Sequence, residues 1–510
     1  MSRILTLRVA ALALSSCVAA LGFAGPSLAQ DGPIVDLAAG AVQGSAGDVV
    51  SFMGIPYAAP PTGPLRWKAP QPAERWEGVL EATAFGPACM QQGDREMSED
   101  CLYVNVWAPR EALEETADLP VLVWVFGGSF HGGSGDIDGA PLAAKGAIVV
   151  SMNYRVSTMG FLAHPDLSAE ALSGVSGNYG LLDVIESLRW VKNNIDAFGG
   201  DPERVTVWGL SSGASLLTAL MSSPLATNLF DQAILQSPGA LRNWATREDS
   251  EALGVGLGED IETLRGLAAT DIEHIRNVGG GTDFRDLAGS RVIGPTLDGF
   301  VLPFSERDAF LQGRANMVPL LIGTVTDEGS MFTGNYPIED EQAYADYLGL
   351  PTTFGEDGAE ALALYPASSA DEIERAVADS FGDNQFVYGV RGVARAVTAA
   401  GFPVYRYAFA RQIDGSDPTH GGDLAYSMGS PALGEAPYEA ADLELSEAIM
   451  QAWVDFAATG NPNGGIIEDW PVYDLQSEPV YVLDTEFTTV DAPRTEQLDF
   501  MEKRAAITAR

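Results

Sequence analysis

The stretch RVTVWGLSSGASLL, residues 204–217, constrains the fold of this 510-residue chain more than any other. A β-branched run enters a Gly-x-Ser-x-Gly box, and a segment rich in alanine and leucine leaves it. A strand that turns abruptly into a helix strains its turn residue and brings neighbouring backbone close, so glycines two positions before and after relieve the crowding. The box therefore predicts a tight strand–turn–helix with a serine at the turn.

Of the two adjacent serines in this box, only Ser211 has the required glycines, Gly209 and Gly213. The residues at those offsets from Ser212 are leucine and alanine. Ser211 is therefore the candidate nucleophile, whereas Ser212 is expected to offer its backbone N–H to a developing oxyanion. A serine alcohol is a weak nucleophile and needs a base, usually a histidine that a carboxylate orients.

The base has to come from four histidines. His420, in DPTHGGDLAY, lies on a loop beyond a predicted strand, where a base is needed, and is the candidate. His131 follows a glycine-rich turn and is a candidate pocket residue. His164, in AHPD, and His274, in DIEHIRN, are interpreted as surface residues.

The acid is expected just after another predicted strand, in GTVTDEGS. Asp327 and Glu328 both stand there, and the local pattern does not separate them. With either residue, the order along the chain is serine, acid, histidine, which is the order in α/β-hydrolases.

A second glycine-rich turn provides a candidate anion trap. VLVWVFGGSF places Gly127, Gly128 and Ser129 directly after a strand, where backbone N–H groups can point at an oxyanion. The alternative, a phosphate-binding loop, lacks both the GxGxxG and the GxxxxGK[ST] pattern. No His/Cys/Asp cluster has metal-ligand spacing either, so we expect neither a metal nor another cofactor.

Short apolar, β-rich runs alternate with helical segments along the chain. This alternation predicts an α/β fold with a large, mostly parallel, twisted sheet covered by helices on both faces, and ligands at the carboxyl ends of the strands. We see no interdomain linker, and residues 240–315 and 335–400 are expected to be helical insertions that resemble a lid. The predicted strands are Val121–Phe126, Ala147–Met152, Val205–Trp208, Gln232–Gln236, Leu320–Gly323, Val404–Ala408 and Val480–Leu483, and the predicted helices are Gly180–Phe198 and Leu445–Ala458.

The N-terminal residues 1–29 have the pattern of a secretory signal peptide. Arg3 and Arg8 precede an apolar stretch, Val9–Phe23, and Ser27-Leu28-Ala29 offers the small residues of a cleavage site. The apolar stretch is too short for a comfortable membrane span. We therefore expect export to the periplasm or the extracellular space.

A competing interpretation is that Leu14-Ser15-Ser16-Cys17 is a lipobox, which would make Cys17 a lipidated N-terminus.

Residues 30–510 are expected to form a single domain. Only Cys89 and Cys101 remain in it. Two cysteines in an exported chain favour a disulfide between them.

The chain is strongly acidic, with 70 acidic and 29 basic residues and a net charge of −41. Such a surface repels nucleic acid and anionic membranes and disfavours polyanionic substrates. We expect no nucleic-acid partner and no membrane span. The expected partner is a small-molecule substrate, and the expected state is a monomer or a weak homo-oligomer.

Taken together, these motifs resemble the type-B carboxylesterase family of α/β-hydrolases, which includes cholinesterases and bacterial p-nitrobenzyl esterases. The resemblance runs from about residue 33 to residue 490. It implies a triad of Ser211, Glu328 and His420, and so chooses Glu328 over Asp327. The stretches that carry it are GIPYAAPPTGPLRW, SEDCLYVNVW, NYRVSTMGFL, GNYGLLD, NNIDAFGGDPERVTVWGLSSGAS, TDEGS, HGGDLAY and TGNPN…WPVYD.

The same resemblance implies oxyanion donors from the backbones of Gly128, Ser129 and Ser212. It also implies the Cys89–Cys101 disulfide. In cholinesterases the loop between the matching cysteines carries a tryptophan for the choline cation. Here that loop reads MQQGDREMSED and has none, so cholinesterase activity is not expected.

The chain departs from the family pattern at three positions near the expected site. Phe126 stands where the family often has His or Tyr, and Ser129 stands where it has a third glycine. Leu210 stands where a Glu usually precedes the nucleophile. A carboxylate there would lie close to the histidine and favour its cation, and Leu210 removes that help.

The leading hypothesis is a secreted carboxylic-ester hydrolase that acts through an acyl-enzyme on small to medium apolar or aromatic esters. One alternative is a non-catalytic binding or adhesion protein on the same fold, of the kind that usually loses the nucleophile. Another is the hydrolysis of related acyl bonds in amides, carbamates or lactones.

Overall fold

A ten-stranded sheet forms the centre of the computed structural model. The structure describes residues 32–508 except 94, 115–116, 242, 259, 275–293, 334–337, 339 and 431–436. The strand order is β17-β16-β15-β14-β11-β10-β8-β9-β7-β3. The strands from β16 to β9 pair in parallel, whereas the pairings with β17, β7 and β3 at the two edges are antiparallel. The bounds are β3 Val49–Pro56, β7 Tyr103–Pro109, β8 Leu119–Val125, β9 Ile148–Met152, β10 Gly200–Leu210, β11 Gln232–Gln236, β14 Leu320–Val325, β15 Val404–Phe409, β16 Pro479–Leu483 and β17 Thr488–Asp491.

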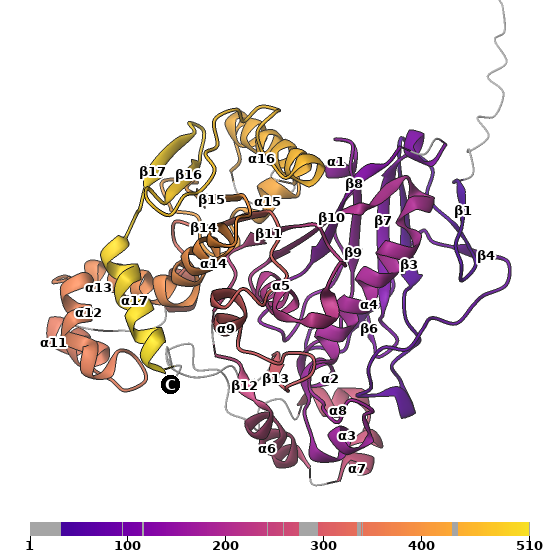
Figure 1. Cartoon of the computed structure of the whole chain (residues 1–510), viewed down its shortest axis with the longest axis horizontal. Helices are drawn as coiled ribbons and strands as arrows, with labels where there is room; N and C mark the ends of the chain where they lie inside the picture. Colours follow the sequence, from indigo (N-terminus) through magenta and orange to yellow (C-terminus); the bar gives the residue numbers. More distant parts are fainter. Residues whose placement is uncertain are drawn as a thin grey trace, which may run out of the picture. The chain divides into compact units, whose positions relative to one another are not determined.

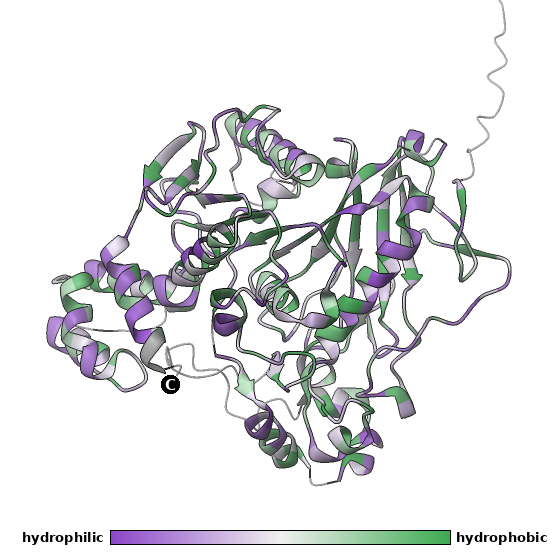
Figure 2. Ribbon diagram, viewed as in Figure 1, coloured by the Kyte–Doolittle hydropathy of each residue, from purple (hydrophilic) through white to green (hydrophobic). Residues whose placement is uncertain are grey.

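The parallel part of the sheet contains every strand that the sequence predicts. Strands β9, β11 and β14 are buried at all their positions, as expected where helices cover both faces. Figure 2 shows the hydrophobic colour of these strands at the centre, and hydrophilic residues on the outer sides of the helices. The antiparallel strands were not predicted: β3 alternates between buried and half-buried positions, and β17 is exposed throughout.

Helices cover the sheet from both sides (Figure 1). Helix α5 and helix α16 both pack against β8 and β10, from opposite faces. Helices α4, α9 and α14 belong to the layer of α5, and α1 packs with α16. The bounds are α1 Ala140–Ala143, α4 Tyr179–Asn194, α5 Ser212–Ser222, α9 Glu306–Leu311, α14 Tyr388–Ala399 and α16 Ala440–Thr459.

The two expected insertions are helical where the structure describes them. Residues 335–400 do not form a lid throughout, because α14 packs on β14 and β15 and so belongs to a layer of the sheet. Part of the other insertion, 275–293, lies outside the described residues. The further helices of these insertions are α6 Arg247–Leu257, α7 Ile261–Arg265, α8 Ala269–His274, α11 Glu341–Leu348, α12 Gly358–Leu364 and α13 Ala370–Gly382, with a π-helix, Asp383–Val387, between α13 and α14. Helix α10, Ser330–Thr333, lies just before the second insertion.

Smaller elements complete the description. A three-stranded sheet and two short strand pairs lie outside the central sheet. The strands are β1 Ile34–Asp36, β2 Ala41–Gln43 and β4 Val79–Glu81, then β5 Ala88–Cys89 with β6 Met97–Ser98, and β12 Ala245–Thr246 with β13 Thr296–Leu297. Further α-helices are α2 Ser157–Phe161, α3 Pro165–Glu170, α15 Leu424–Ser427 and α17 Thr495–Thr508, and short 3-10 helices are Gly63–Leu65, Arg110–Leu113, Ile195–Phe198, Pro224–Ala226 and Gly355–Asp357.

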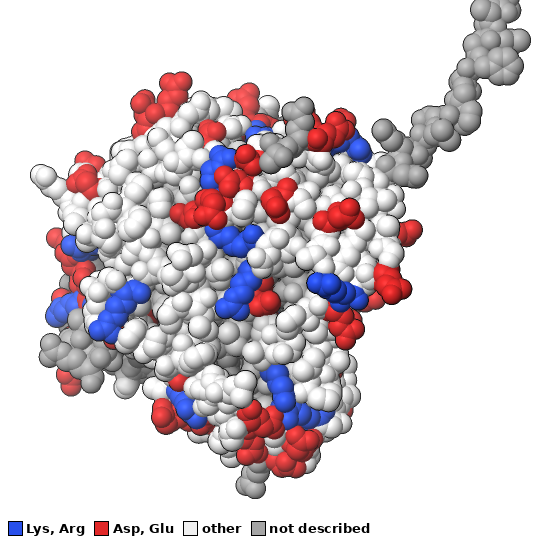
Figure 3. Space-filling model, turned by 45° about the vertical axis from the view of Figure 1, so that its right-hand side comes forward, with Lys and Arg blue, Asp and Glu red and all other residues white. Residues whose placement is uncertain are grey.

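The predicted disulfide is confirmed. Cys89 and Cys101 form a disulfide with an S–S distance of 2.06 Å. Within the described ranges, none of the helices has the length and apolar character needed to cross a membrane. On the face drawn in Figure 3, acidic side chains gather in several groups and basic ones stand among them, so that face carries no continuous basic surface. The predicted signal peptide and Cys17 lie outside the described residues.

The carboxylate of Asp442, in the first turn of α16, is held by several donors in a fully buried position. It accepts hydrogen bonds from Arg411 Nε at 2.6 Å, from Tyr426 Oη at 2.7 Å and from the backbone N–H of Glu439 at 2.7 Å. Burial alone would raise the pKa of Asp442, but these donors, Arg411 first, bring it down to about 2. The ionised form therefore stabilises the fold.

We expect Asp442→Asn to lower the melting temperature at pH 7, with a loss of up to about 2 kcal/mol. Because the pKa in the folded state lies below the ordinary value of 3.8, this contribution is present above pH 4 and disappears as the pH falls towards 2. Melting curves between pH 7 and pH 2 measure it, with Glu444→Gln on the exposed side of the same helix as control. A difference that stays constant over this range would contradict the prediction.

Candidate active site

Ser211 lies at the turn between β10 and α5 with φ 57° and ψ −125°, a conformation that side chains rarely adopt. A Cβ on Gly213 would lie 2.2 Å from the carbonyl oxygen of Val125, and one on Gly209 would lie 3.0 Å from the same oxygen. Gly213 therefore has no room for a side chain and Gly209 has little, for the reason that the sequence predicted. The Ser211 N–H donates to the carbonyl of Gln236 on β11 at 2.9 Å, which ties the turn to the next strand.

A chain of hydrogen bonds leads from this serine to a buried carboxylate. Ser211 Oγ lies 2.8 Å from His420 Nε2, and His420 Nδ1 lies 2.5 Å from Glu328 Oε2. Glu328 also accepts hydrogen bonds from Ser237 Oγ at 2.6 Å and from the N–H of Val325 at 3.0 Å. With its Nδ1–H directed at Glu328, a neutral imidazole presents Nε2 as an acceptor for the serine proton.

The two neighbouring acids are separated clearly by this geometry. Glu328 is 3% exposed and contacts His420, whereas the carboxylate of Asp327 accepts from both the N–H, at 3.0 Å, and the hydroxyl of Ser330. Asp327 therefore caps the turn that begins α10. Of the two candidates, only Glu328 is positioned to orient the histidine.

The glycine-rich turn after β8 lies directly beside the serine. A Cβ on Gly127 would lie 3.1 Å from Ser211 Cβ. Gly128 and Ser129 have positive φ angles of 126° and 56°, and within the described part of the chain neither of their N–H groups meets a protein acceptor. Ser212 is the first residue of α5, where N–H groups have no acceptor within the helix. These three groups can therefore donate to an oxyanion.

Comparison with known proteins identifies the family of this chain. Residues 31–501 match the family model described as "Carboxylesterase family". The chain belongs to the carboxylesterase family. It is 42% identical over 460 residues to a fumonisin B1 esterase of Sphingopyxis macrogoltabida, a match that covers 86% of this chain and 84% of the relative. It is 35% identical over 502 residues to a para-nitrobenzyl esterase of Bacillus subtilis (strain 168), covering 91% and 97% of the two chains.

Solved structures give the same result. A PNB esterase structure superposes with a TM-score of 0.80 at 34% identity, over 92% of this chain and 99% of the other. The predicted α/β-hydrolase fold and the type-B carboxylesterase family are thus confirmed. The protein is a carboxylic-ester hydrolase by family.

Sequence reasoning missed two aromatic side chains that enclose the histidine of this carboxylesterase. The rings of Phe386 and Phe332 lie 4.4 Å and 5.2 Å from the His420 ring, centre to centre. Phe332 is on α10, and Phe386 is in the π-helix before α14. No local pattern marks them, because the histidine they contact follows a different strand. Their packing makes the surroundings of the histidine apolar.

Leu210 adds to this apolar character. It is 9% exposed, and its Cδ2 would lie 3.4 Å from a Cβ placed on Gly421, the residue after the histidine. A buried carboxylate that the sequence did not single out, Asp423, lies nearby and accepts from Gln236 Nε2 at 2.8 Å and from Tyr407 Oη at 2.7 Å. Burial raises the pKa of Asp423, and the nearby Glu328 raises it further.

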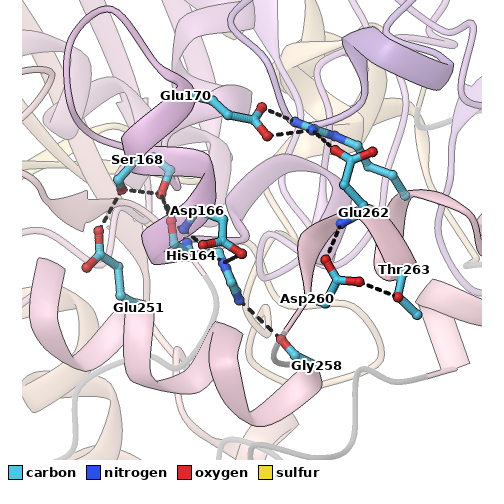
Figure 4. A network of polar contacts seen from close by, with 11 residues as sticks. His164, Asp166, Ser168, Glu170, Glu251, Gly258, Asp260, Glu262 and Thr263 are labelled. Carbon is cyan, nitrogen blue, oxygen red and sulfur yellow. Dashed lines mark hydrogen bonds and ion pairs between the residues drawn. The ribbon is translucent and has the colours of Figure 1, made fainter.

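The surface interpretation of His164 was wrong. The residue is 1% exposed, and Figure 4 shows it between α3 and the end of α6. Its Nδ1 accepts from the N–H of Asp166 at 3.1 Å, which caps α3, and its Nε2 lies 3.1 Å from the carbonyl oxygen of Gly258. The AHPD pattern does mark a turn, but a segment distant in the sequence covers it.

The other two histidines lie elsewhere. His274 ends α8, and its side chain lies outside the described residues. His131 closes the turn after β8 by donating its N–H to Gly128 at 2.9 Å.

Proposed function

We propose that the protein is an exported serine carboxylesterase in which Ser211, His420 and Glu328 form the catalytic triad. The observation that carries this proposal is the hydrogen-bonded chain from Ser211 Oγ through His420 to Glu328, at a strained turn beside unoccupied N–H groups. Loss of the nucleophile would be expected in a binding protein on this fold, and Ser211 is present with its partners.

In the first half of the reaction, Ser211 Oγ attacks the ester carbonyl carbon while its proton moves to His420 Nε2. Glu328 accepts the Nδ1–H throughout and stabilises the imidazolium. The carbonyl oxygen becomes an oxyanion, for which the N–H groups of Gly128, Ser129 and Ser212 are the proposed donors. His420 then returns the proton to the leaving alkoxide as the C–O bond breaks, which leaves an acyl-enzyme.

In the second half, water replaces the alcohol. His420 takes a proton from the water, the hydroxide adds to the acyl carbonyl, and the oxyanion forms again at the same donors. Collapse of this intermediate breaks the bond to Ser211, which recovers its proton from His420. The carboxylic acid leaves, and no further reactant is needed.

The side chains packed around the histidine support a proposed substrate range. Phe332, Phe386 and Leu210 make the neighbourhood of the histidine apolar, which favours small to medium apolar or aromatic esters. The similarity to a fumonisin B1 esterase also makes fumonisin B1 an ester to include among the substrates tested.

The proposal extends to where and in what form the protein acts. The signal-peptide pattern and the disulfide support export, since disulfides persist in oxidising compartments. Residues 30–510 would form one domain, and the protein would act as a monomer or a weak homo-oligomer.

We expect the purified protein to hydrolyse p-nitrophenyl acetate and butyrate with kcat/KM of about 10⁴ M⁻¹ s⁻¹ or more, in the usual range of enzymes. A matched anilide should react far more slowly, because its leaving group is poorer. EDTA should leave the rate unchanged, since no group of three or more potential ligands is found in the described part of the chain. A folded protein that cleaves the anilide but not the esters would contradict the proposal, as would a rate lost in EDTA and restored by a divalent ion.

A further inference from the structure

We propose that the hydroxyl of Ser212 is a positioning residue that holds the oxyanion loop, residues 127–133, in its working conformation. This inference rests on the proposed function. It gives Ser212 two tasks, because its backbone N–H is one proposed oxyanion donor and its side chain fixes the loop that supplies the other two.

The oxyanion loop has an unfavourable backbone conformation. Three consecutive residues, Gly128, Ser129 and Phe130, have φ angles of 126°, 56° and 64°. Glycine adopts positive φ readily, but serine and phenylalanine do not. Such a conformation persists only where surrounding contacts enforce it. The contacts of Phe130 are therefore what keeps the preceding N–H groups directed at the serine.

The backbone of Phe130 is held on both sides. Its N–H donates to Ser212 Oγ at 3.2 Å, and its carbonyl accepts from the N–H of Ser157 at 2.6 Å. Ser212 is 1% exposed and Phe130 is fully buried, so water does not replace either bond readily. The Phe130 ring packs edge to face against Phe161 at 5.5 Å and Trp244 at 5.9 Å.

Among these contacts, the hydrogen bond between the Phe130 N–H and Ser212 Oγ is the one that reaches the residue beside the proposed nucleophile. Ser212 follows the proposed nucleophile directly, at the start of α5, so its hydroxyl links the oxyanion loop to the turn that carries Ser211. This side chain thereby helps to set the distance between the nucleophile and the oxyanion donors. Without it, the Gly128–Ser129 and Ser129–Phe130 peptides could rotate until Ser129 and Phe130 reach negative φ, which would draw the Ser129 N–H away from the oxyanion.

The effect should appear in the transition state rather than in substrate binding. The oxyanion exists only in the transition state and intermediates, so misplaced donors lower kcat and leave KM nearly unchanged. Deleting one oxyanion donor outright costs about 10²–10³ in kcat. For Ser212→Ala, which keeps the N–H groups and loosens their placement, we expect kcat to fall roughly 10- to 100-fold, at or below that range.

The test uses Ser212→Ala in the full-length protein, with Ser222→Ala as a matched control. Ser222 is a buried serine at the other end of α5, and its hydroxyl donates to Thr218 within the same helix. Removing it should change neither kcat nor KM. Thermal melts of the two variants show whether each is folded. A boronic acid that forms a tetrahedral adduct should bind Ser212→Ala more weakly, by the same factor as the loss in kcat.

A second variant tests the strain directly. Ser129→Gly keeps the donor N–H and removes the cost of the positive φ at this position, so the loop depends less on Ser212. In the Ser129→Gly background, Ser212→Ala should lower kcat by a clearly smaller factor than it does in the parent protein. A double-mutant cycle measures this difference as a coupling between the two positions. Purely additive effects, a loss confined to KM, or full activity of Ser212→Ala would overturn the inference. If Ser211→Ala is inactive, any of these results would leave the proposed function intact. An active Ser211→Ala would contradict both the proposed function and the inference about Ser212.

Discussion

Replacement of Ser211 by alanine should reduce kcat for p-nitrophenyl acetate by about six orders of magnitude, the usual cost of removing the nucleophile of a triad. The residual rate over water would come from the oxyanion donors and from substrate binding, which the substitution leaves in place. Alanine tolerates the positive φ at the turn as poorly as serine does, so the fold should be unchanged. A melting curve checks this.

The comparison with Ser212→Ala fixes the register of the turn. Ser212→Ala is expected to retain between about one and ten per cent of kcat, because Ser211 still attacks and only the placement of the donors suffers. An inactive Ser212→Ala beside an active Ser211→Ala would show that the adjacent serine is the nucleophile.

Glu328→Gln is expected to lower kcat by about 10⁴, as loss of the triad carboxylate does elsewhere. Glutamine keeps the size of the side chain, and its carbonyl oxygen can still accept from Ser237 and Val325. The amide, however, can donate to Nδ1 and so favours the wrong tautomer of His420. The free energy lost is therefore catalytic, and the melting temperature should change little.

Asp327→Asn is the matched control for this substitution. It makes the same chemical change one residue earlier, and asparagine still caps the turn at Ser330 through its oxygen. Its kcat should stay within about threefold of the parent protein, since the Asp327 carboxylate is hydrogen-bonded to Ser330 and the bond to His420 comes from Glu328. Full activity of Glu328→Gln, or an inactive and folded Asp327→Asn, would assign the acid differently.

The parallel strands and the turn at Ser211 could be predicted because their causes are local. Strands buried on both faces have continuous apolar runs, and a carbonyl oxygen 2.2 Å from a Cβ on Gly213 and 3.0 Å from one on Gly209 explains why glycines flank the turn. The edge strands β3 and β17 are not recognisable in this way, since their exposure depends on which strand pairs beside them.

The surroundings of the triad could not be predicted because their causes are distant in the sequence. Phe386 and His420 come from a helix and a loop on either side of β15, and only the folded sheet brings their rings to 4.4 Å. His164 shows the same limit, since Gly258, which covers it, is 94 residues away. The hydroxyl of Ser212 is a third example, with its partner 82 residues earlier.

The carboxyl ends of β8, β10, β14 and β15 supply the oxyanion loop, Ser211, Glu328 and His420 in turn. Ser211 and His420 are 209 residues apart, so they meet only after the strands between them have assembled, and long-range pairing of this kind is slow. A nascent chain on the ribosome should therefore stay inactive at least until His420 has emerged. Ester cleavage should therefore appear late in refolding, and the rate of p-nitrophenyl acetate turnover should report when the strands from β8 to β15 have assembled.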